Sequence, residues 1–324
     1  MKRLTKMGIH LLNTFLKSLE DNGSRIINIG DLRNKTIVVD ASIYMYRFAA
    51  MNGLLENTYL MCSIFRSYNI NILFVFDGKI GENKENTLLK RREEREKAKK
   101  EYYECSKLIN NADENEKEIL EEKMNKLRRT FVKITNKDIR NVKELLYSYG
   151  IEYVVANGEA DELCARMVID GMAYACLSED TDLFAYGCPR ILKYMSLMNH
   201  TVVLYPICDI LKSIKIKFID FQTLCILSGT DYNDSKRNIF SFYKLFKKYT
   251  CKKEAPDVEF IDWLKNEKYI SLQIYYQLKD IHYIYNKDSK TIFQNISISN
   301  IRNKKIEKNR LRSVMKEECF VFAN

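Results

Sequence analysis

The sequence predicts an α/β fold built around a parallel β-sheet, and two observations carry this prediction. The apolar run Ile151–Val155 leads into an amphipathic helical segment that ends at Gly171, and a second apolar run, Ala173–Leu177, follows. Short apolar runs separated by a helix of this length are typical of a β-α-β unit with parallel strands. Comparable runs that can supply further strands occur at 35–39, 71–76, 191–194 and 201–205.

Acidic residues follow both runs of this unit. Gly-Glu-Ala-Asp stands at 158–161 after the first run, and Glu-Asp-Thr-Asp stands at 179–182 after the second. A single acid near a turn is usually solvated or caps a helix. Five acids beyond the carboxyl ends of neighbouring strands lie where open α/β sheets bind ligands, and like charges held close repel unless a cation lies between them. The pattern therefore favours a divalent metal site.

Two other predicted strands also end in aspartate. Asp40 follows the β-branched run 35–39, and Asp77 follows the run 71–76. A third aspartate, Asp231, follows the apolar helix predicted at 221–227. Each could simply cap a helix, which is a common role for aspartate. Their recurrence at strand and helix ends favours a shared acidic site.

The charge balance favours a polyanionic partner. The 324 residues carry a net charge of +10, and residues 205–324 alone carry 22 Lys and Arg against 14 Asp and Glu, a net of +8. An acidic pocket beside a basic half suits a nucleic-acid backbone, although a basic protein need not bind nucleic acid.

Cysteine usage and hydropathy predict a soluble intracellular protein. The nine cysteines are scattered singly without a Cys-x-x-Cys pair, which argues against a disulfide scaffold and against structural zinc. No run is long and apolar enough to span a bilayer, and the first residues lack a signal-peptide core. The three histidines, His10, His200 and His282, are too far apart in the sequence to suggest a histidine-based site.

Residues 82–133 are dense in charge and contain no proline. Two helices are predicted there, at about Asn86–Lys107 and Asp113–Lys133. Charge pattern alone favours solvated helices with ion pairs between residues four apart.

The acidic motifs at 158–161 and 179–182 together resemble the internal motif of the flap endonuclease family, the structure-specific 5′-nucleases of the XPG superfamily. Met-Gly-Ile at 7–9, Phe-Asp-Gly-Lys at 76–79 and Ser-Gly-Thr-Asp-Tyr at 228–232 resemble other words of that family, so the resemblance covers about residues 7–250. It implies a PIN-like 5′-nuclease fold: a central, mostly parallel twisted sheet with helices on both faces, a helical arch at about 82–133 and a helical C-terminal lobe. The implied domains are 1–232, the catalytic domain, and 233–324, a divergent helix–turn–helix region with a basic lobe.

The same resemblance implies the site. Seven acids would hold two Mg²⁺ ions, for which Mn²⁺ can substitute, with the first four at one ion and the last three near the other: Asp40, Asp77, Glu159, Asp161, Asp180, Asp182 and Asp231. In the family a glutamate usually stands at the position of Asp161, and the glycine matching Gly8 lies close to the site. Lys84 and Arg91 match the catalytic lysine and arginine of the arch. Further implied nucleic-acid contacts are Tyr46, which would stack on a base although its pattern alone favours a core position, and Arg128 and Arg129 in the arch.

The sequence departs from the family at the helix–turn–helix. The family has a Gly-Ile-Gly hairpin that grips duplex phosphates with the help of potassium, whereas Asn238 and Phe240 flank Ile239 here. The hairpin is therefore expected to be missing or rebuilt. Basic residues that would still contact duplex remain nearby: Lys236, Arg237, Lys244, Lys247 and Lys248. No motif resembles the family's sliding-clamp motif, and the basic tail at 302–316 is expected to be disordered or a solvated helix.

The resemblance implies a metal-dependent 5′-nuclease that hydrolyses flap, nicked or branched DNA by a two-metal mechanism in replication, repair or recombination. Such an enzyme would work in the nucleus or in a cytoplasmic replication compartment. Three alternatives stay open: a non-catalytic nucleic-acid-binding scaffold of the same fold, a 5′–3′ exonuclease or junction resolvase, and a ribonuclease.

Overall fold

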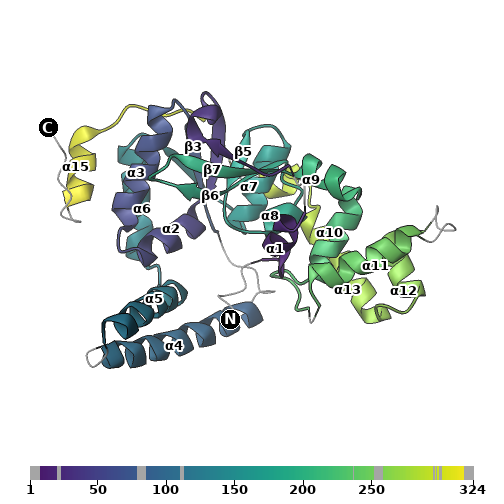
Figure 1. Cartoon of the computed structure of the whole chain (residues 1–324). Coiled ribbons are helices and arrows are strands. Elements are labelled where there is room, and N and C mark those ends of the chain that lie inside the picture. Colours follow the sequence, from purple (N-terminus) through teal and green to yellow (C-terminus); the bar gives the residue numbers. More distant parts are fainter. Residues whose placement is uncertain are drawn as a thin grey trace.

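A computed structural model describes residues 8–19, 23–78, 85–109, 113–235, 237–251, 258–294, 296, 298 and 301–316. Within these residues, strands form one sheet in the order β1-β7-β6-β5-β2-β3-β4 (Figure 1). Neighbouring strands from β6 to β4 are parallel, whereas β7 pairs antiparallel with β6 and with β1. The predicted α/β fold is confirmed. The apolar runs at 191–194 and 201–205 are both strands, β6 and β7. The strand bounds are β1 Arg25–Asn28, β2 Thr36–Asp40, β3 Asn71–Phe76, β4 Glu152–Val155, β5 Ala175–Leu177, β6 Arg190–Ser196 and β7 Thr201–Pro206.

Helices cover both faces of the sheet, and each face has its own hydrophobic core. Along β2, Val38 enters one core while Ile37 and Val39 enter the other. Successive strand side chains point to opposite faces, so a strand buried on both faces must be apolar throughout. The helices are α1 Leu12–Lys17, η1 Ile29–Leu32, α2 Ala41–Ala50, α3 Leu54–Ser67, α4 Glu85–Leu108, α5 Glu114–Phe131, α6 Asn136–Ser148, α7 Ala160–Ile169, α8 Asp182–Ala185, α9 Ile207–Ile214, α10 Phe218–Leu227, α11 Ile239–Cys251, α12 Phe260–Asn266, α13 Leu272–Tyr285, α14 Ser289–Ile292 and α15 Lys308–Lys316.

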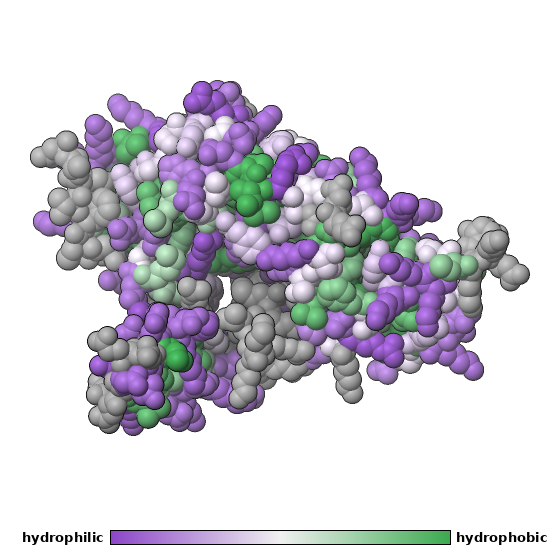
Figure 2. All heavy atoms as spheres, in the orientation of Figure 1, coloured by the Kyte–Doolittle hydropathy of each residue, from purple (hydrophilic) through white to green (hydrophobic). Residues whose placement is uncertain are grey.

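The two helices predicted at 82–133 are present as α4 and α5. They pack against each other and project from the sheet as a mostly hydrophilic pair (Figures 1 and 2). The ring of Tyr102 meets that of Phe131 at 5.2 Å between centroids, and Lys123 forms a 2.9 Å ion pair with Glu101. Asp113 caps the start of α5. This arrangement agrees with both interpretations of residues 82–133, a pair of solvated helices and a projecting arch.

The C-terminal segment contradicts the expectation of a disordered or solvated tail. Helix α15 packs on α6 and buries Leu311 and Met315, which lie one turn apart on one face. Before it, the Lys304 N–H donates to the Gly150 carbonyl at 2.7 Å. Gly150 has φ +74°, and a Cβ there would lie 2.4 Å from the Lys304 carbonyl oxygen. The basic composition concealed this short apolar face.

Helices α10 to α13 share one hydrophobic core with α7 and α8, so packing is continuous across residue 232. The domain boundary at 232 stays a prediction. No described helix has the length and hydropathy needed to cross a membrane. The eight cysteines in the described residues are free thiols.

Candidate active site

Aspartates from three adjacent parallel strands lie at one edge of the sheet. Asp40 is the last residue of β2, Asp77 directly follows β3, and Asp180 and Asp182 follow β5. Because β5, β2 and β3 are neighbours and parallel, their carboxyl ends lie side by side. This is the edge at which open α/β sheets place their sites.

The charges of Asp77 and Asp180 act on Asp40. The pKa of Asp40 is raised to about 7, first by burial and then by the charges of Asp77 and Asp180. The Ser178 hydroxyl donates to Asp40 at 3.0 Å and opposes the shift. Asp40 also caps α2, because its Oδ1 accepts from the Ile43 N–H at 3.5 Å. Asp40 therefore caps α2 and also senses the charges of two other aspartates, while its place in a metal site stays a prediction.

Gly78 allows Asp77 to reach the start of α7. The Asp77 carboxylate accepts from the Ala160 N–H at 2.9 Å, and the Gly78 N–H donates to the Gly158 carbonyl at 2.8 Å. A Cβ on Gly78 would lie 1.9 Å from the carbonyl oxygen of Ala156, which no small shift can relieve. The glycine is thus required for the close approach of two backbones that hold the site.

We therefore expect Gly78→Ala to destabilise the fold by about 1–3 kcal/mol, the usual cost of forcing extra atoms into a packed position. Gly158→Ala is the matched control, since its Cβ would find only the Glu162 carboxylate, at 3.8 Å. Thermal or urea unfolding measures both variants. Equal stability of the two would contradict the required backbone contact.

Residues from α7 and from the end of α10 meet beside this edge. Glu159 occupies the N-cap position of α7, and its carboxylate accepts from the Tyr232 hydroxyl at 3.0 Å. Burial raises the pKa of Tyr186, and the charge of Asp161 and then the neighbouring Tyr232, Tyr285 and Glu159 raise it further. Asp231 precedes Tyr232 in the turn that ends α10.

The loop at 180–182 lies against the N-terminal segment. The Asp182 N–H donates to the Asp180 carboxylate at 2.9 Å, and the Ile9 N–H donates to the Thr181 hydroxyl at 2.6 Å. Gly8 has φ +69°, and a Cβ there would lie 2.6 Å from Asp180 Oδ1. The structure thus places Gly8 against the acidic loop, where the resemblance implied a glycine.

Glu179 departs from the expected cluster of five acids. Its carboxylate accepts from the Tyr194 N–H at 2.8 Å and lies 3.5 Å from the guanidinium of Arg47. The ammonium of buried Lys193 donates to the Glu179 carbonyl at 2.7 Å. The Glu179 carboxylate is therefore engaged with β6 and α2, and the prediction that all five acids group together is wrong.

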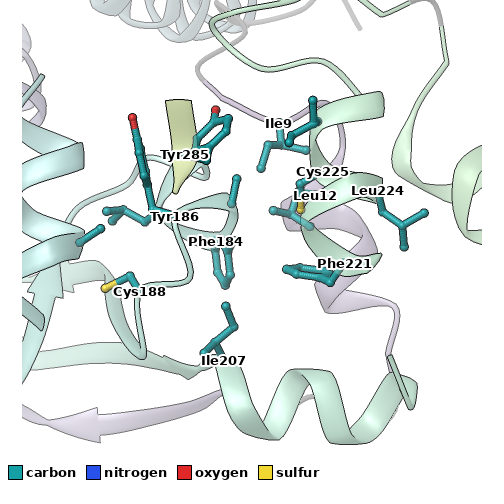
Figure 3. Packing of buried hydrophobic residues seen from close by; sticks show 14 of the residues in the cluster. Ile9, Leu12, Phe184, Tyr186, Cys188, Ile207, Phe221, Leu224, Cys225 and Tyr285 are labelled. Carbon is teal, nitrogen blue, oxygen red and sulfur yellow. The ribbon is translucent and has the colours of Figure 1, made fainter. Parts of the chain in front are cut away.

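Sequence reasoning missed Tyr285, on α13. Its hydroxyl donates to the Asp182 carboxylate at 2.7 Å, and its ring lies 4.6 Å from that of Tyr186 and 5.5 Å from that of Tyr232. Burial, and next the charge of Asp182, raises the pKa of Tyr285. Figure 3 shows the hydroxyls of Tyr186 and Tyr285 pointing to the same side, away from Phe184 and Phe221. No motif surrounds Tyr285, so only the fold could reveal this contact.

The other expected contact residues lie outside this acidic edge or outside the described residues. Lys84 and Lys236 are not among the described residues, and the side chains of Arg91 and Arg129 are not described. Tyr46 is 40% exposed on α2, so the core position favoured by its pattern alone is wrong. Arg128 donates to Asn52 at the base of the arch. The basic residues of the α11 region are exposed: Arg237, Lys244, Lys247 and Lys248.

The altered hairpin positions belong to the start of α11. Asn238 accepts from the Ser241 N–H at 3.2 Å, as a helix cap does, and Phe240 packs edge-on to Phe15 at 5.4 Å between ring centroids. Neither Asn238 nor Phe240 has a positive φ. Phe240 therefore joins α11 to α1 by packing and does not adopt the left-handed conformation that glycine allows.

The donor set at the acidic edge fits a hard cation. In the part of the chain that the structure describes, no three acidic, histidine or cysteine side chains already converge into a metal-binding group. Like charges held close repel, and the charges of Asp77 and Asp180 add to burial in raising the pKa of Asp40. Carboxylate oxygens are the ligands that Mg²⁺ and Mn²⁺ prefer, so the chemistry of the residues fits although the described side chains are not preassembled.

Comparison with known proteins identifies the family. The XPG N-terminal domain matches residues 7–98 and the XPG I-region matches residues 150–231. Flap endonuclease 1 of Methanococcus aeolicus is 34% identical over 223 residues, which is 64% of this chain and 65% of that protein. The chain thus spans just under two thirds of that relative's length.

Solved structures agree on the fold. The catalytic core of Rad2 in complex with a DNA substrate superposes with a TM-score of 0.62 at 20% identity, covering 96% of this chain and 94% of that one. The Holliday junction-resolving enzyme GEN1, in complex with product DNA and Mg²⁺, gives a TM-score of 0.61 at 17% identity, covering 94% and 72%. At these identities the likeness concerns the fold, and the domain matches carry the assignment. The chain belongs to the XPG family of structure-specific nucleases.

Proposed function

We propose that this chain is a metal-dependent structure-specific 5′-nuclease that hydrolyses flap, nicked or branched DNA in replication, repair or recombination. The observation that carries the proposal is the position of Asp40, Asp77 and Asp180 at the carboxyl ends of three adjacent parallel strands. The GEN1 relative binds product DNA with Mg²⁺ and the Rad2 relative binds a DNA substrate, which supports the same chemistry here.

The ligands would be the seven acids already named, with Asp40, Asp77, Glu159 and Asp161 at one ion and Asp180, Asp182 and Asp231 near the other. Two such ions, when bound, activate water and stabilise the leaving oxygen. Lys84 and Arg91 would stabilise charge on the phosphate, and Tyr46, exposed on α2, offers a ring for stacking. Arg128 and Arg129 would contact the single-stranded flap.

Cleavage by the purified protein with Mg²⁺ tests the proposal directly. Labelled flap, nicked, blunt and single-stranded DNA, together with RNA of matched sequence, separate a flap endonuclease from an exonuclease and from a ribonuclease. We expect flap DNA to be cut fastest and cleavage to stop in chelator. Binding without cleavage of any substrate would contradict the proposal and favour a non-catalytic scaffold.

Binding of this chain to duplex DNA is expected to be mainly electrostatic. Because Asn238 and Phe240 form the start of a helix, the exposed lysines of α11 supply mobile charges instead of a fixed backbone cradle. With about four phosphate contacts, affinity should fall roughly 10²-fold between 50 and 200 mM salt. Fluorescence anisotropy with flap DNA in matched KCl and NaCl measures this, and we expect the two salts to agree within about twofold.

A double variant tests whether the lysines of α11 cause this dependence of DNA affinity on salt concentration. Replacing Lys247 and Lys248 by alanine should lower the salt slope by about two, because each lysine is expected to neutralise one phosphate. A clear gain of affinity in potassium over sodium would instead show a specific cation-assisted duplex site.

A further inference from the structure

Tyr285 connects the C-terminal helices to the acidic edge of the sheet. Its hydroxyl donates to Oδ2 of Asp182 at 2.7 Å, and the two residues are 4% and 2% exposed. Because both groups are buried, water cannot replace the phenol as the partner of this carboxylate oxygen. The phenol therefore determines where the oxygen lies.

A partly buried polar network holds α13 in place for this contact. The two ring nitrogens of His282, one turn before Tyr285, lie 3.0 Å from the Thr223 hydroxyl and 2.9 Å from the Gln222 amide oxygen. The Gln222 amide nitrogen donates to the Ala185 carbonyl at 2.7 Å. Ala185 ends α8, the helix that Asp182 begins. The start of this short helix therefore bonds directly to α13, and its end is linked to α13 through Gln222 of α10.

The ring of Tyr285 is fixed separately from its hydroxyl. It packs edge-on against Tyr186 and Tyr232, and the hydroxyl of Tyr232 donates to Glu159. Loss of the Tyr285 hydroxyl alone would leave this ring packing intact, which makes the hydrogen bond testable by a conservative substitution.

We propose that Tyr285 is a positioning residue that orients Asp182 for metal binding, so that the C-terminal helix α13 is part of the active site. The inference rests on the proposed function, since it takes Asp182 as a metal ligand. Hydrogen bonds to a ligating carboxylate fix its orientation, and their removal commonly weakens metal binding about 10- to 100-fold.

The test compares Tyr285→Phe with Tyr283→Phe by calorimetric titration of Mn²⁺ into the full chain without DNA. Tyr283 lies on the same helix but is 76% exposed, so its hydroxyl is the matched control. We expect Mn²⁺ binding to weaken about 10-fold or more in Tyr285→Phe and to be unchanged in Tyr283→Phe. The Mg²⁺ concentration for half-maximal flap cleavage should rise in parallel, while turnover at saturating Mg²⁺ recovers to within a few-fold of wild type.

Two results would overturn the inference while leaving the proposed function intact. One is an unchanged Mn²⁺ affinity in Tyr285→Phe accompanied by a lower Tm in chelator, which would mean that the hydroxyl only stabilises packing. The other is a further loss of Mn²⁺ affinity when Tyr285→Phe is added to Asp182→Asn, because a residue that acts through Asp182 should then add nothing. A wild-type chain that binds no Mn²⁺ would overturn both the proposed function and this inference.

Discussion

Asp180→Asn is expected to abolish flap cleavage, with single-turnover rates at least about 10³-fold lower, equivalent to roughly 4 kcal/mol of transition-state stabilisation. The substitution removes one ligand charge from the acidic edge, where Asp180 already raises the pKa of Asp40. Affinity for flap DNA should stay within a few-fold of wild type, because phosphate contacts elsewhere remain. Single-turnover cleavage and anisotropy measure the two quantities separately.

Glu179→Gln provides the matched control for that loss. Glu179 adjoins Asp180, but its carboxylate is occupied by Tyr194 and Arg47, and glutamine can still accept from the Tyr194 N–H. Flap cleavage should survive this substitution. In chelator, Asp180→Asn should be at least as stable as wild type, since it relieves repulsion with Asp40. Undiminished turnover in Asp180→Asn would contradict the assignment of Asp180 as a metal ligand.

Arg91→Ala is expected to lower single-turnover flap cleavage about 10²- to 10³-fold, the usual cost of removing one group that stabilises charge in the transition state. Binding should change much less, because this interaction strengthens as the phosphate distorts. Rapid-quench kinetics together with equilibrium binding separate the two effects.

The neighbouring Arg92 offers the control for Arg91. It is exposed on the same helix, and consecutive residues of a helix point about 100° apart. Arg92→Ala should therefore leave turnover close to wild type. If Arg91→Ala reduces only binding, and does so no more than Arg92→Ala, the start of α4 is a basic surface and not part of the catalytic site.

Local sequence was enough to predict the frame of the site. Strand β3 lies at Asn71–Phe76, as its apolar run predicted, and Asp40 and Asp77 stand at the strand ends where the runs stopped. A strand buried on both faces leaves an uninterrupted apolar run, and a polar residue at its end marks the sheet edge. The four-residue strand β1 was missed because it is an edge strand whose Ile26 is 74% exposed, so its burial gives little pattern.

By itself, then, the sequence determined the parallel sheet, the helical pair α4 and α5, and the sheet edge at which the aspartates lie. Each of these follows from a pattern in a short stretch of consecutive residues. Only the tertiary structure decided that Glu179 turns toward Arg47 while its neighbour Asp180 affects Asp40. It also decided that Phe240 packs on Phe15, and that Tyr285 reaches Asp182 from 103 positions away. Two adjacent acids look alike in the sequence. The direction in which each side chain points, and the distant residue that it contacts, are set by the packing of helices and loops that lie far apart in the chain.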